Sequence, residues 1–248
     1  MSKRQEIRQR HQQEQKRNRI IVILLIVGGA LLVIAALAVP GLMKSGVTPT
    51  SAAIVQITPV AYTAPMDKTS MGKPNAPVKM DVWEDFQCSG CLSYTEKTEG
   101  QVLQAYVETG KVYYTFHFFP FIDGGQGESH QAANAAECAS AQGRFRDYHD
   151  MLFANWLGEN AGSYTDARLV TFAQDIGLDM TKFNQCFQAN TYAVQIQQDY
   201  AAGAALGVPP TPGIFVNGQA VFSNAGKDYL PSFDDISKVI DAALGGAK

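Results

Sequence analysis

The hydrophobic residues of the central part of the chain fall into segments of different spacing. Val78–Trp83 and Lys111–Phe119 are short and rich in β-branched and aromatic residues, which is typical of β-strands. Between them, Leu92–Val107 places apolar side chains on one face of a helix, and Gly110 is suited to end it. A strand, a helix and a second strand in this order predict an α/β fold, a central sheet with helices on its faces.

Helical spacing dominates the next part of the chain, from Ser129 to about Leu206. Strand patterns flank this block on both sides, so we expect an insertion at about residues 125–206 within one domain that spans residues 74–248. Within this block we expect helices at Thr165–Ile176 and Thr181–Leu206, the second with a break near Gly203. After it we expect two strands, Ile214–Val216 and Ala220–Phe222, joined by an Asn217-Gly218 turn. A last helix is expected to end at Leu244.

Residues 20–39 contain no charged or polar side chain. A helix of this length extends about 30 Å, which matches the hydrocarbon thickness of a bilayer. Residues 1–19 carry a net charge of +5, whereas the whole chain carries −3. Because basic segments stay in the cytoplasm, we predict a single transmembrane anchor in the cell membrane, with the rest of the chain outside the cytoplasm. The alternative is a signal peptide cleaved near Ala36-Leu37-Ala38, which also exports the body.

Residues 40–73 are rich in Ser, Thr, Ala, Pro and Gly, so we interpret them as a linker, to which Ile54–Ile57 could add a short edge strand. The body of the chain has no basic patch with interleaved aromatic residues, and the net charge is small. A nucleic-acid partner is therefore not expected.

Cys88 and Cys91 stand three positions apart, between the first predicted strand and the helix that follows. The free N–H groups and the dipole of a helix N-terminus stabilise a thiolate, the reactive species in disulfide exchange. Cys88 is therefore the candidate nucleophile, and Cys91 is suited to attack a mixed disulfide on Cys88. Half of a zinc site or a purely structural pair are the alternatives. His117, His130 and His149 lack the paired spacing of zinc ligands, so no metal is expected.

A second motif, Gly207–Gly218, places Thr211-Pro212 directly before a predicted strand. A proline is unusual there unless its peptide bond is cis. A cis Thr-Pro bond turns the chain sharply and leaves the Thr backbone free for a partner chain. The alternative is that these prolines only end one helix and begin the next strand.

Three stretches, Asp85-Phe86-Gln87-Cys88-Ser89-Gly90-Cys91, Thr211-Pro212 and Phe215-Val216-Asn217-Gly218, together resemble the motifs of membrane-anchored DsbA-type thioredoxin-fold oxidoreductases. The resemblance covers about residues 74–245 and includes insertion stretches such as Glu137-Cys138-Ala139. It implies a thioredoxin fold with an inserted helical subdomain, preceded in this chain by the expected transmembrane helix.

The resemblance implies a role for four residues. Cys88 is the exposed nucleophile, Cys91 its partner thiol, and Pro212 the cis-proline beside them. Thr211 offers its backbone to the substrate strand. The resemblance also implies a catalyst that introduces disulfides into unfolded or reduced exported proteins without a cofactor, and that a membrane quinone-linked protein reoxidises.

One departure from the family concerns a buried acid. Family members commonly place it six residues before the first cysteine, where this chain has Val82. The route of the proton from the buried thiol is therefore open. We interpret the nearby Asp81 and Glu84 as solvated or capping groups rather than catalytic ones. The Ser-Gly pair between the cysteines also differs from the more usual pair with a proline, which leaves the redox potential open.

Cys138 and Cys186 both fall in the helical block. We interpret them as a structural disulfide, which could contribute about 3–4 kcal/mol on the chain-entropy model. Free buried thiols and a second redox pair are the alternatives. We interpret His117 as a half-exposed strand residue rather than a catalytic base. Trp83 and Phe86 fit equally well as core residues or as an apolar rim for unfolded substrate.

Donation of disulfides to exported proteins is the function that we expect. A reductase or isomerase would use the same residues and would differ in the stability of its reduced form. A membrane-anchored binding domain is a third hypothesis. Its inert cysteines would not react with alkylating reagents near neutral pH.

Overall fold

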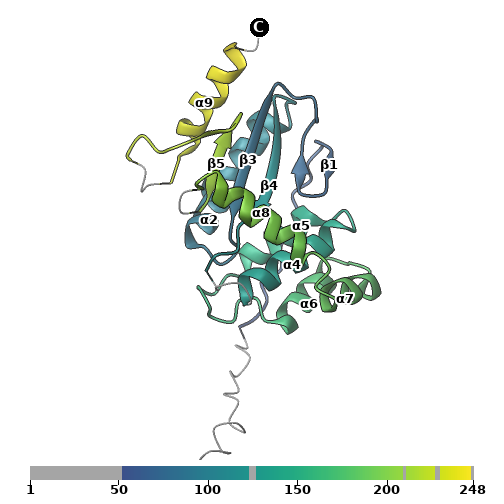
Figure 1. Ribbon diagram of the computed structural model, residues 1–248. Helices are drawn as coiled ribbons and strands as arrows, with labels where there is room; N and C mark the ends of the chain where they lie inside the picture. The colour runs from purple at the N-terminus through teal and green to yellow at the C-terminus, as the bar shows by residue number, and fades with distance from the viewer. Residues whose placement is uncertain (1–51, 123–126, 209–210, 227–229, 247–248) are drawn as a thin grey trace, which may run out of the picture. The chain divides into compact units, whose positions relative to one another are not determined.

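The computed structural model describes residues 52–122, 127–208, 211–226 and 230–246 (Figure 1). The expected basic segment and transmembrane helix, residues 1–19 and 20–39, lie outside this part of the chain. Among the described residues, no helix is both long and apolar enough to cross a membrane. The fold below is that of the compact unit that begins at Ala52.

Six strands in the described residues form one mixed sheet in the order β1-β2-β4-β3-β5-β6. The central strands β3 (Val78–Glu84) and β4 (Val112–Phe118) run parallel, as expected for a strand–helix–strand unit. On its other side, β3 pairs antiparallel with β5 (Gly213–Val216). This pairing brings the late Thr211-Pro212 motif to the strand that leads into the two cysteines. The edge strand β6 (Gln219–Ala220) is shorter than the expected strand at Ala220–Phe222.

The last part of the expected linker, within residues 40–73, is structured and contains two short strands. Met66–Asp67 (β1) and Ser70–Met71 (β2) form a hairpin, and β2 pairs antiparallel with β4. Strands of two residues are too short to show an alternating pattern in the sequence. Ile54–Ile57 forms no strand, but both of its isoleucines pack against the core. The described domain therefore begins near residue 52 rather than at residue 74.

A continuous helical stretch connects β3 to β4, close to the expected Leu92–Val107. Gly110, with a φ of 74°, then turns the chain into β4. The stretch contains wider π-helical turns, which are frequent near functional sites. Its parts are α2 (Ser89–Tyr94), the π-helix η1 (Thr95–Glu99), α3 (Gly100–Val102) and the π-helix η2 (Leu103–Val107).

The inserted helices follow β4, and Figure 1 shows α4 to α7 gathered beyond one end of the central strands. The helix expected at Thr181–Leu206 is in fact two helices. They separate at residues 189–192, where Asn190 adopts a φ of 48°, and not near Gly203. The bounds are α4 (Glu128–Ser140), α5 (Phe145–Ala154), α6 (Asp166–Asp175), α7 (Met180–Gln188) and α8 (Ala193–Ala205).

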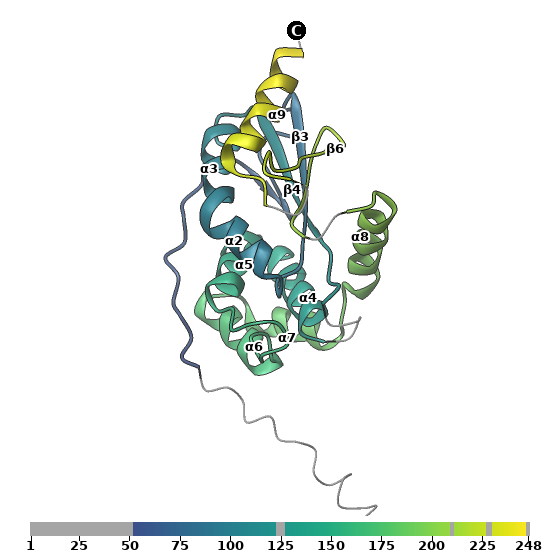
Figure 2. The same cartoon turned by 90° about the vertical axis from the view of Figure 1, so that its left-hand side faces the viewer.

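Gly203 has a packing role inside α8. A Cβ atom at this position would lie 2.7 Å from the Trp83 ring and 2.8 Å from the Phe119 ring. Glycine therefore allows α8 to lie directly on the sheet. Figure 2 shows α8 on one side of the sheet and the helices α3 and α9 (Phe233–Gly246) on the other.

Alternation along the central strands sets the two faces of the sheet. On β4, buried residues alternate with half-buried ones over the whole strand. The buried face continues into the insertion, where Phe86 packs on Phe116 and Phe153. Trp83 and Phe86 are 4% and 1% exposed, so both belong to the core rather than to a substrate rim.

Candidate active site

The two cysteines of the CxxC motif lie where β3 leads into α2. Cys88 is the N-cap residue of this helix and has an extended backbone conformation. Neither cysteine is in a disulfide. Cys91 is fully buried, whereas Cys88 is 9% exposed. The expected exposed nucleophile is thus largely covered, but it remains the more accessible thiol of the pair.

The surroundings of Cys88 favour its thiolate. A hydrogen-bonding interaction with the Cys91 thiol has the largest effect and lowers the pKa of Cys88, while burial acts in the opposite direction. The Thr211 side chain and the backbone N–H groups of Cys91 and Gly90 lower the pKa further, to about 6. Cys88 is therefore mostly ionised at neutral pH, which is the state that exchanges disulfides.

Cys91 has the opposite character. Burial raises the pKa of its thiol well above the ordinary value, and interactions with Cys88 and with the Glu84 carboxylate raise it further. A thiol that ionises near pH 6 thus lies next to one that stays protonated. In the fully reduced pair the negative charge is therefore best held on Cys88, and Cys91 requires a proton.

The Thr211-Pro212 peptide bond is cis, and its loop lies against the cysteines. Cys88 Sγ lies 3.3 Å from the Thr211 carbonyl oxygen, to which the protonated form of the thiol donates. A Cβ atom on Gly90 would lie only 2.8 Å from that oxygen and 3.5 Å from Pro212 Cδ. Glycine between the cysteines therefore permits this close approach. The structure brings together Cys88, Cys91, Thr211 and Pro212, the four residues that the motifs singled out.

Asp85 holds the turn before Cys88 in place, a role that the sequence did not reveal. This buried carboxylate accepts hydrogen bonds from the backbone N–H groups of Gln87 at 2.8 Å, Phe121 at 2.9 Å and Ile122 at 3.1 Å. It also accepts a bond of 2.6 Å from the Ser129 hydroxyl at the start of α4. Burial raises the pKa of Asp85, and these donors partly offset the effect. Asp85 thereby ties the cysteine turn to the insertion.

The insertion also binds the backbone of Phe86 and Gln87 directly. Trp156 Nε1 donates to the Gln87 carbonyl at 2.9 Å, and the Tyr164 hydroxyl donates to the Phe86 carbonyl at 2.9 Å. The Gln87 side chain is fully buried and donates to Ser129 Oγ at 2.9 Å. The helical insertion therefore fixes the segment from which the nucleophile projects.

Glu84 corrects one expectation from the sequence. It is 1% exposed rather than solvated, and it follows Val82 on the buried face of β3. Burial has the largest effect on the Glu84 carboxyl and raises its pKa well above the ordinary value, and the charge of Glu99 adds to this. The charge of the Glu84 carboxylate in turn raises the pKa of the Cys91 thiol. Alternation along β3 was the signal for this placement, because inward positions recur every second residue.

Asp81 and His117 lie away from the thiols. His117 is half-buried, as expected, with Nε2 2.9 Å from Asp81 Oδ1 and Nδ1 3.8 Å from Asp199 Oδ1. Its ring stacks on Trp83 at 4.2 Å. Burial lowers the pKa of His117, but hydrogen bonds to Asp199 and Asp81 outweigh it and raise the pKa to about 9. Asp81, with a side chain that is 32% exposed, is thus a partly solvated ion-pair partner of a charged histidine and not a catalytic group.

Cys138 and Cys186 form a disulfide that joins α4 to α7. Their Cα atoms are 5.8 Å apart, and Cys138 is 1% exposed. The bond lies inside the insertion and involves neither Cys88 nor Cys91. It therefore holds two inserted helices together.

Comparisons with known proteins found similar sequences and similar folds. The family model described as thioredoxin matches residues 65–242. A curated relative, the probable disulfide bond formation protein D of Bacillus cereus, is 25% identical over 218 residues, which cover 82% of this chain and 97% of that protein. The oxidised BdbD structure from Bacillus subtilis has a TM-score of 0.63 and 21% identity, covering 76% of this chain and 100% of that one. DsbA of Chlamydia trachomatis has a TM-score of 0.60 and 21% identity, with coverages of 77% and 96%.

Proposed function

This chain belongs to the thioredoxin family and is a thiol–disulfide oxidoreductase, and we propose that it donates disulfide bonds to exported proteins through the Cys88–Cys91 pair. The contrast between the two thiols carries the proposal. A Cys88 pKa of about 6 stabilises the reduced enzyme, so its disulfide form is a stronger oxidant than that of a pair with ordinary thiols. The name of the Bacillus cereus relative, a disulfide bond formation protein, supports the same direction.

The proposed reaction begins when a substrate thiolate attacks Cys88 Sγ and the Cys88–Cys91 bond breaks. Cys91 leaves as a thiolate and takes up one proton. A second substrate thiolate then attacks the substrate sulfur of the mixed disulfide, and Cys88 leaves as a thiolate. Two substrate thiols are oxidised to a disulfide, the enzyme disulfide is reduced to one thiolate and one thiol, and one proton is released.

The substrate strand binds against Thr211 and Pro212 in this proposal. The Thr211 carbonyl lies 3.3 Å from Cys88 Sγ, so a chain that pairs with this loop carries its own sulfur to the nucleophile. Pro212 lies beside the same site, because its Cδ would be 3.5 Å from a Cβ atom on Gly90.

Glu84 supplies the proton for Cys91 in the proposed mechanism. Burial raises the pKa of Glu84 well above its ordinary value, which favours the protonated carboxyl, and the charge of Glu84 in turn acts on the Cys91 thiol. A thiolate formed on Cys91 is unstable in this buried site, so proton transfer from Glu84 favours opening of the disulfide. Glu84 would thereby replace the acid that is missing at Val82.

We also propose that residues 20–39 anchor the chain in the cell membrane and that the domain works outside the cytoplasm. The Cys138–Cys186 disulfide supports an oxidising compartment. Each donation leaves the enzyme reduced, so a partner must reoxidise it. A membrane quinone-linked protein is the partner that suits an anchored enzyme.

A refolding assay tests the proposed direction. The oxidised full-length protein in detergent is mixed with a reduced, unfolded protein that needs its disulfides for activity. We expect activity to return in proportion to the enzyme added, and Cys88→Ser to give none. A protein that instead reduces substrate disulfides and donates none would be a reductase. Failure of both thiols to react with alkylating reagents at neutral pH would indicate a binding domain.

A further inference from the structure

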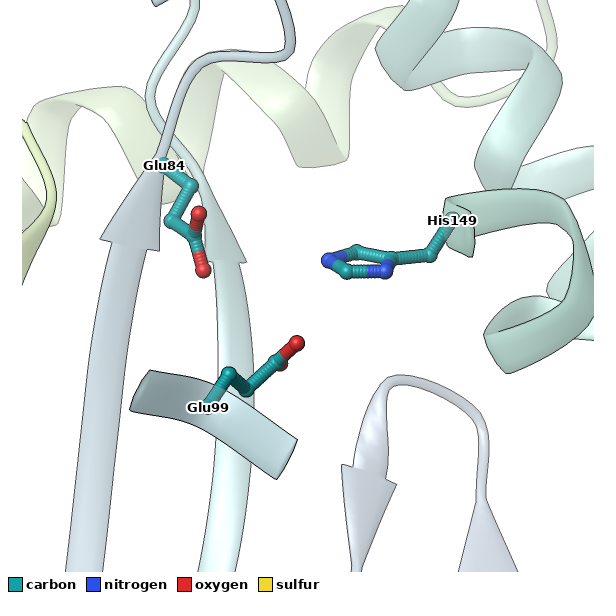
Figure 3. Close-up of side chains that lie close together, drawn as sticks. All are labelled: Glu84, Glu99 and His149. Carbon is teal, nitrogen blue, oxygen red and sulfur yellow. The ribbon is translucent and has the colours of Figure 1, made fainter. Parts of the chain in front are cut away.

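Three buried side chains from different elements converge in the interior of the domain (Figure 3). They are Glu84 at the end of β3, Glu99 in η1 and His149 in α5, with exposed fractions of 1%, 0% and 0%. One atom from each side chain lies within 4.8 Å of the others. Figure 3 shows the imidazole of His149 pointing between the two carboxyl groups. We call these three residues the Glu84 cluster.

The cluster contains buried polar atoms without partners. Within the described residues, both Glu84 oxygens and His149 Nε2 have no hydrogen-bond partner. Burying such an atom unpaired costs about 1–3 kcal/mol, so its retention calls for a function. His149 Nδ1, by contrast, lies 3.0 Å from Asp150 Oδ1. The imidazole therefore has one nitrogen toward Glu84 and the other toward Asp150.

The charges around the cluster indicate a stored proton. Arg146 donates to both oxygens of Glu99 at 2.7 Å, and its Nη2 lies 2.6 Å from Asp150. Burial alone would raise the pKa values of Glu99 and Asp150, but Arg146 lowers both. The guanidinium binds these two carboxylates, whereas burial and the charge of Glu99 raise the pKa of Glu84 and favour its protonated form. A divalent cation is a poorer occupant, because Arg146 already binds both oxygens of Glu99.

We infer that His149 and Asp150 form a proton route between Glu84 and solvent, an inference that rests on the proposed role of Glu84. During disulfide donation, the Cys91 thiolate takes the carboxyl proton of Glu84. Glu84 then takes the Nε2 proton of His149, and His149 takes a proton at Nδ1 through Asp150. The imidazole changes from one tautomer to the other. Reoxidation of the cysteines reverses each step and restores the first tautomer.

Asp150 lies at the solvent end of this route. Its side chain is 20% exposed, whereas the Glu84 cluster is closed. Asp150, Arg146 and Tyr62 line a surface hollow of about 450 Å³ beside helix η1. Water in this hollow can reach Asp150 directly, so the route crosses α5 from the buried thiol to the surface.

The other titratable groups that face the cluster do not compete for the proton. Burial raises the pKa values of the surrounding tyrosines, which keep their protons in the range where exchange occurs. The titratable groups that face Glu84 and His149 come from several elements. They are Tyr62 in the segment before β1, Tyr94 of α2, Glu99 of η1, Tyr114 of β4, Arg146 and Asp150 of α5, and the two cysteines Cys88 and Cys91.

The test measures how fast dithiothreitol reduces the Cys88–Cys91 disulfide of the full-length protein between pH 5 and pH 9. Glu84→Gln removes the proposed proton donor to Cys91 and sets the size of the effect to compare with. His149→Gln removes the proposed relay residue. His117→Gln is the matched control, because His117 lies outside the Glu84 cluster. We expect Glu84→Gln and His149→Gln to slow the step at least tenfold at pH 7, since a positioned acid or base contributes factors of about 100 or more. We expect His117→Gln to react at the wild-type rate.

Two further readouts separate a relay from a structural role. A relay changes the rate only, so the equilibrium of His149→Gln with glutathione should match that of the wild type. Imidazole in the buffer should restore part of the rate of His149→Gly. A change in equilibrium that equals the change in rate, or no rescue by imidazole, would overturn the inference.

The remaining outcomes are also decisive. If dithiothreitol reduces Glu84→Gln slowly but reduces His149→Gln at the wild-type rate, the route is overturned and the proposed function stays intact. Wild-type rates for both variants remove Glu84 from the mechanism as well. Stoichiometric Zn²⁺ binding that His149→Gln abolishes would make the cluster a cation site and overturn the route. If His149→Gln does not fold, Asp150→Asn decides, with a slow rate expected and a wild-type rate contradicting the route.

Discussion

The Cys88 thiol donates a hydrogen bond to the Thr211 carbonyl over 3.3 Å, although the two residues are 123 positions apart in the chain. The register of the sheet explains the contact. Gly213 on β5 pairs with Trp83 on β3, so antiparallel pairing brings the residues before β5 to the end of β3 that leads into Cys88. The site is therefore a consequence of the strand order, and the cis bond at Pro212 completes it.

The ionisation of Cys88 predicts a pH-dependent stability of the reduced protein. Its pKa is about 6 when folded, whereas an unperturbed thiol ionises at about 8.5. A pKa that folding lowers contributes stability above the unfolded value, and this stability is lost as the pH falls through the folded value. From pH 5 to pH 7 the reduced wild type should gain about 1 kcal/mol of unfolding free energy over reduced Cys88→Ser. Urea denaturation at both pH values measures it, and an equal difference at pH 5 and pH 7 would contradict the assignment.

Two glycines in the same helical stretch should respond oppositely to alanine. A Cβ atom on Gly90 would meet the Thr211 carbonyl at 2.8 Å, so Gly90→Ala should displace the cis-proline loop and slow mixed-disulfide formation with a substrate peptide. A Cβ atom on Gly100 would meet no neighbouring part of the described chain within 4 Å. Gly100→Ala should therefore leave the rate unchanged and raise the unfolding free energy by up to about 1 kcal/mol. Equal rates for both variants would show that the close approach at Gly90 is unimportant.

Asp85→Ala should destabilise the domain strongly. The substitution leaves the donors of Gln87, Phe121, Ile122 and Ser129 without their buried acceptor, and we expect a loss of about 3 kcal/mol in unfolding free energy. Asp67→Ala on the exposed hairpin strand β1 is the control and should change it by less than about 0.5 kcal/mol. Similar losses in the two variants would mean that Asp85 is not an organising residue.

The insertion disulfide should matter for stability and not for exchange. Cys138→Ala combined with Cys186→Ala opens a loop that spans 48 positions, and the unfolding free energy should fall by about 3–4 kcal/mol. Reduction of Cys88–Cys91 by dithiothreitol should proceed at the wild-type rate below the unfolding transition. A loss of exchange in the folded double variant would instead assign a redox role to the second pair.

Periodicity and motif order were enough to predict much of this molecule. The CxxC motif at the junction of a strand and a helix, together with Thr211-Pro212 before a strand, predicted residues that the fold brings together. The helical insertion between β4 and β5 also follows from spacing alone. These features are local, so a sequence pattern records them.

Features that depend on distant packing were harder to predict. A carboxylate is rarely buried, so the sequence favours a solvated Glu84, although the alternation of β3 places it inward. Gly203 was interpreted as a helix break, but it allows α8 to lie on Trp83. The strands β1 and β2 have two residues each and depend on β4 for their pairing. In each case the partner lies far away in the sequence.

The reduction potential of the Cys88–Cys91 pair tests the central claim most directly. The full-length protein is equilibrated in glutathione buffers at pH 7, and the thiols are trapped and counted. A Cys88 thiolate stabilised as described predicts a value clearly more oxidising than about −270 mV, shifted toward the oxidising end of the thioredoxin-fold range at about −120 mV. A value near about −270 mV would contradict disulfide donation and make the protein a reductase.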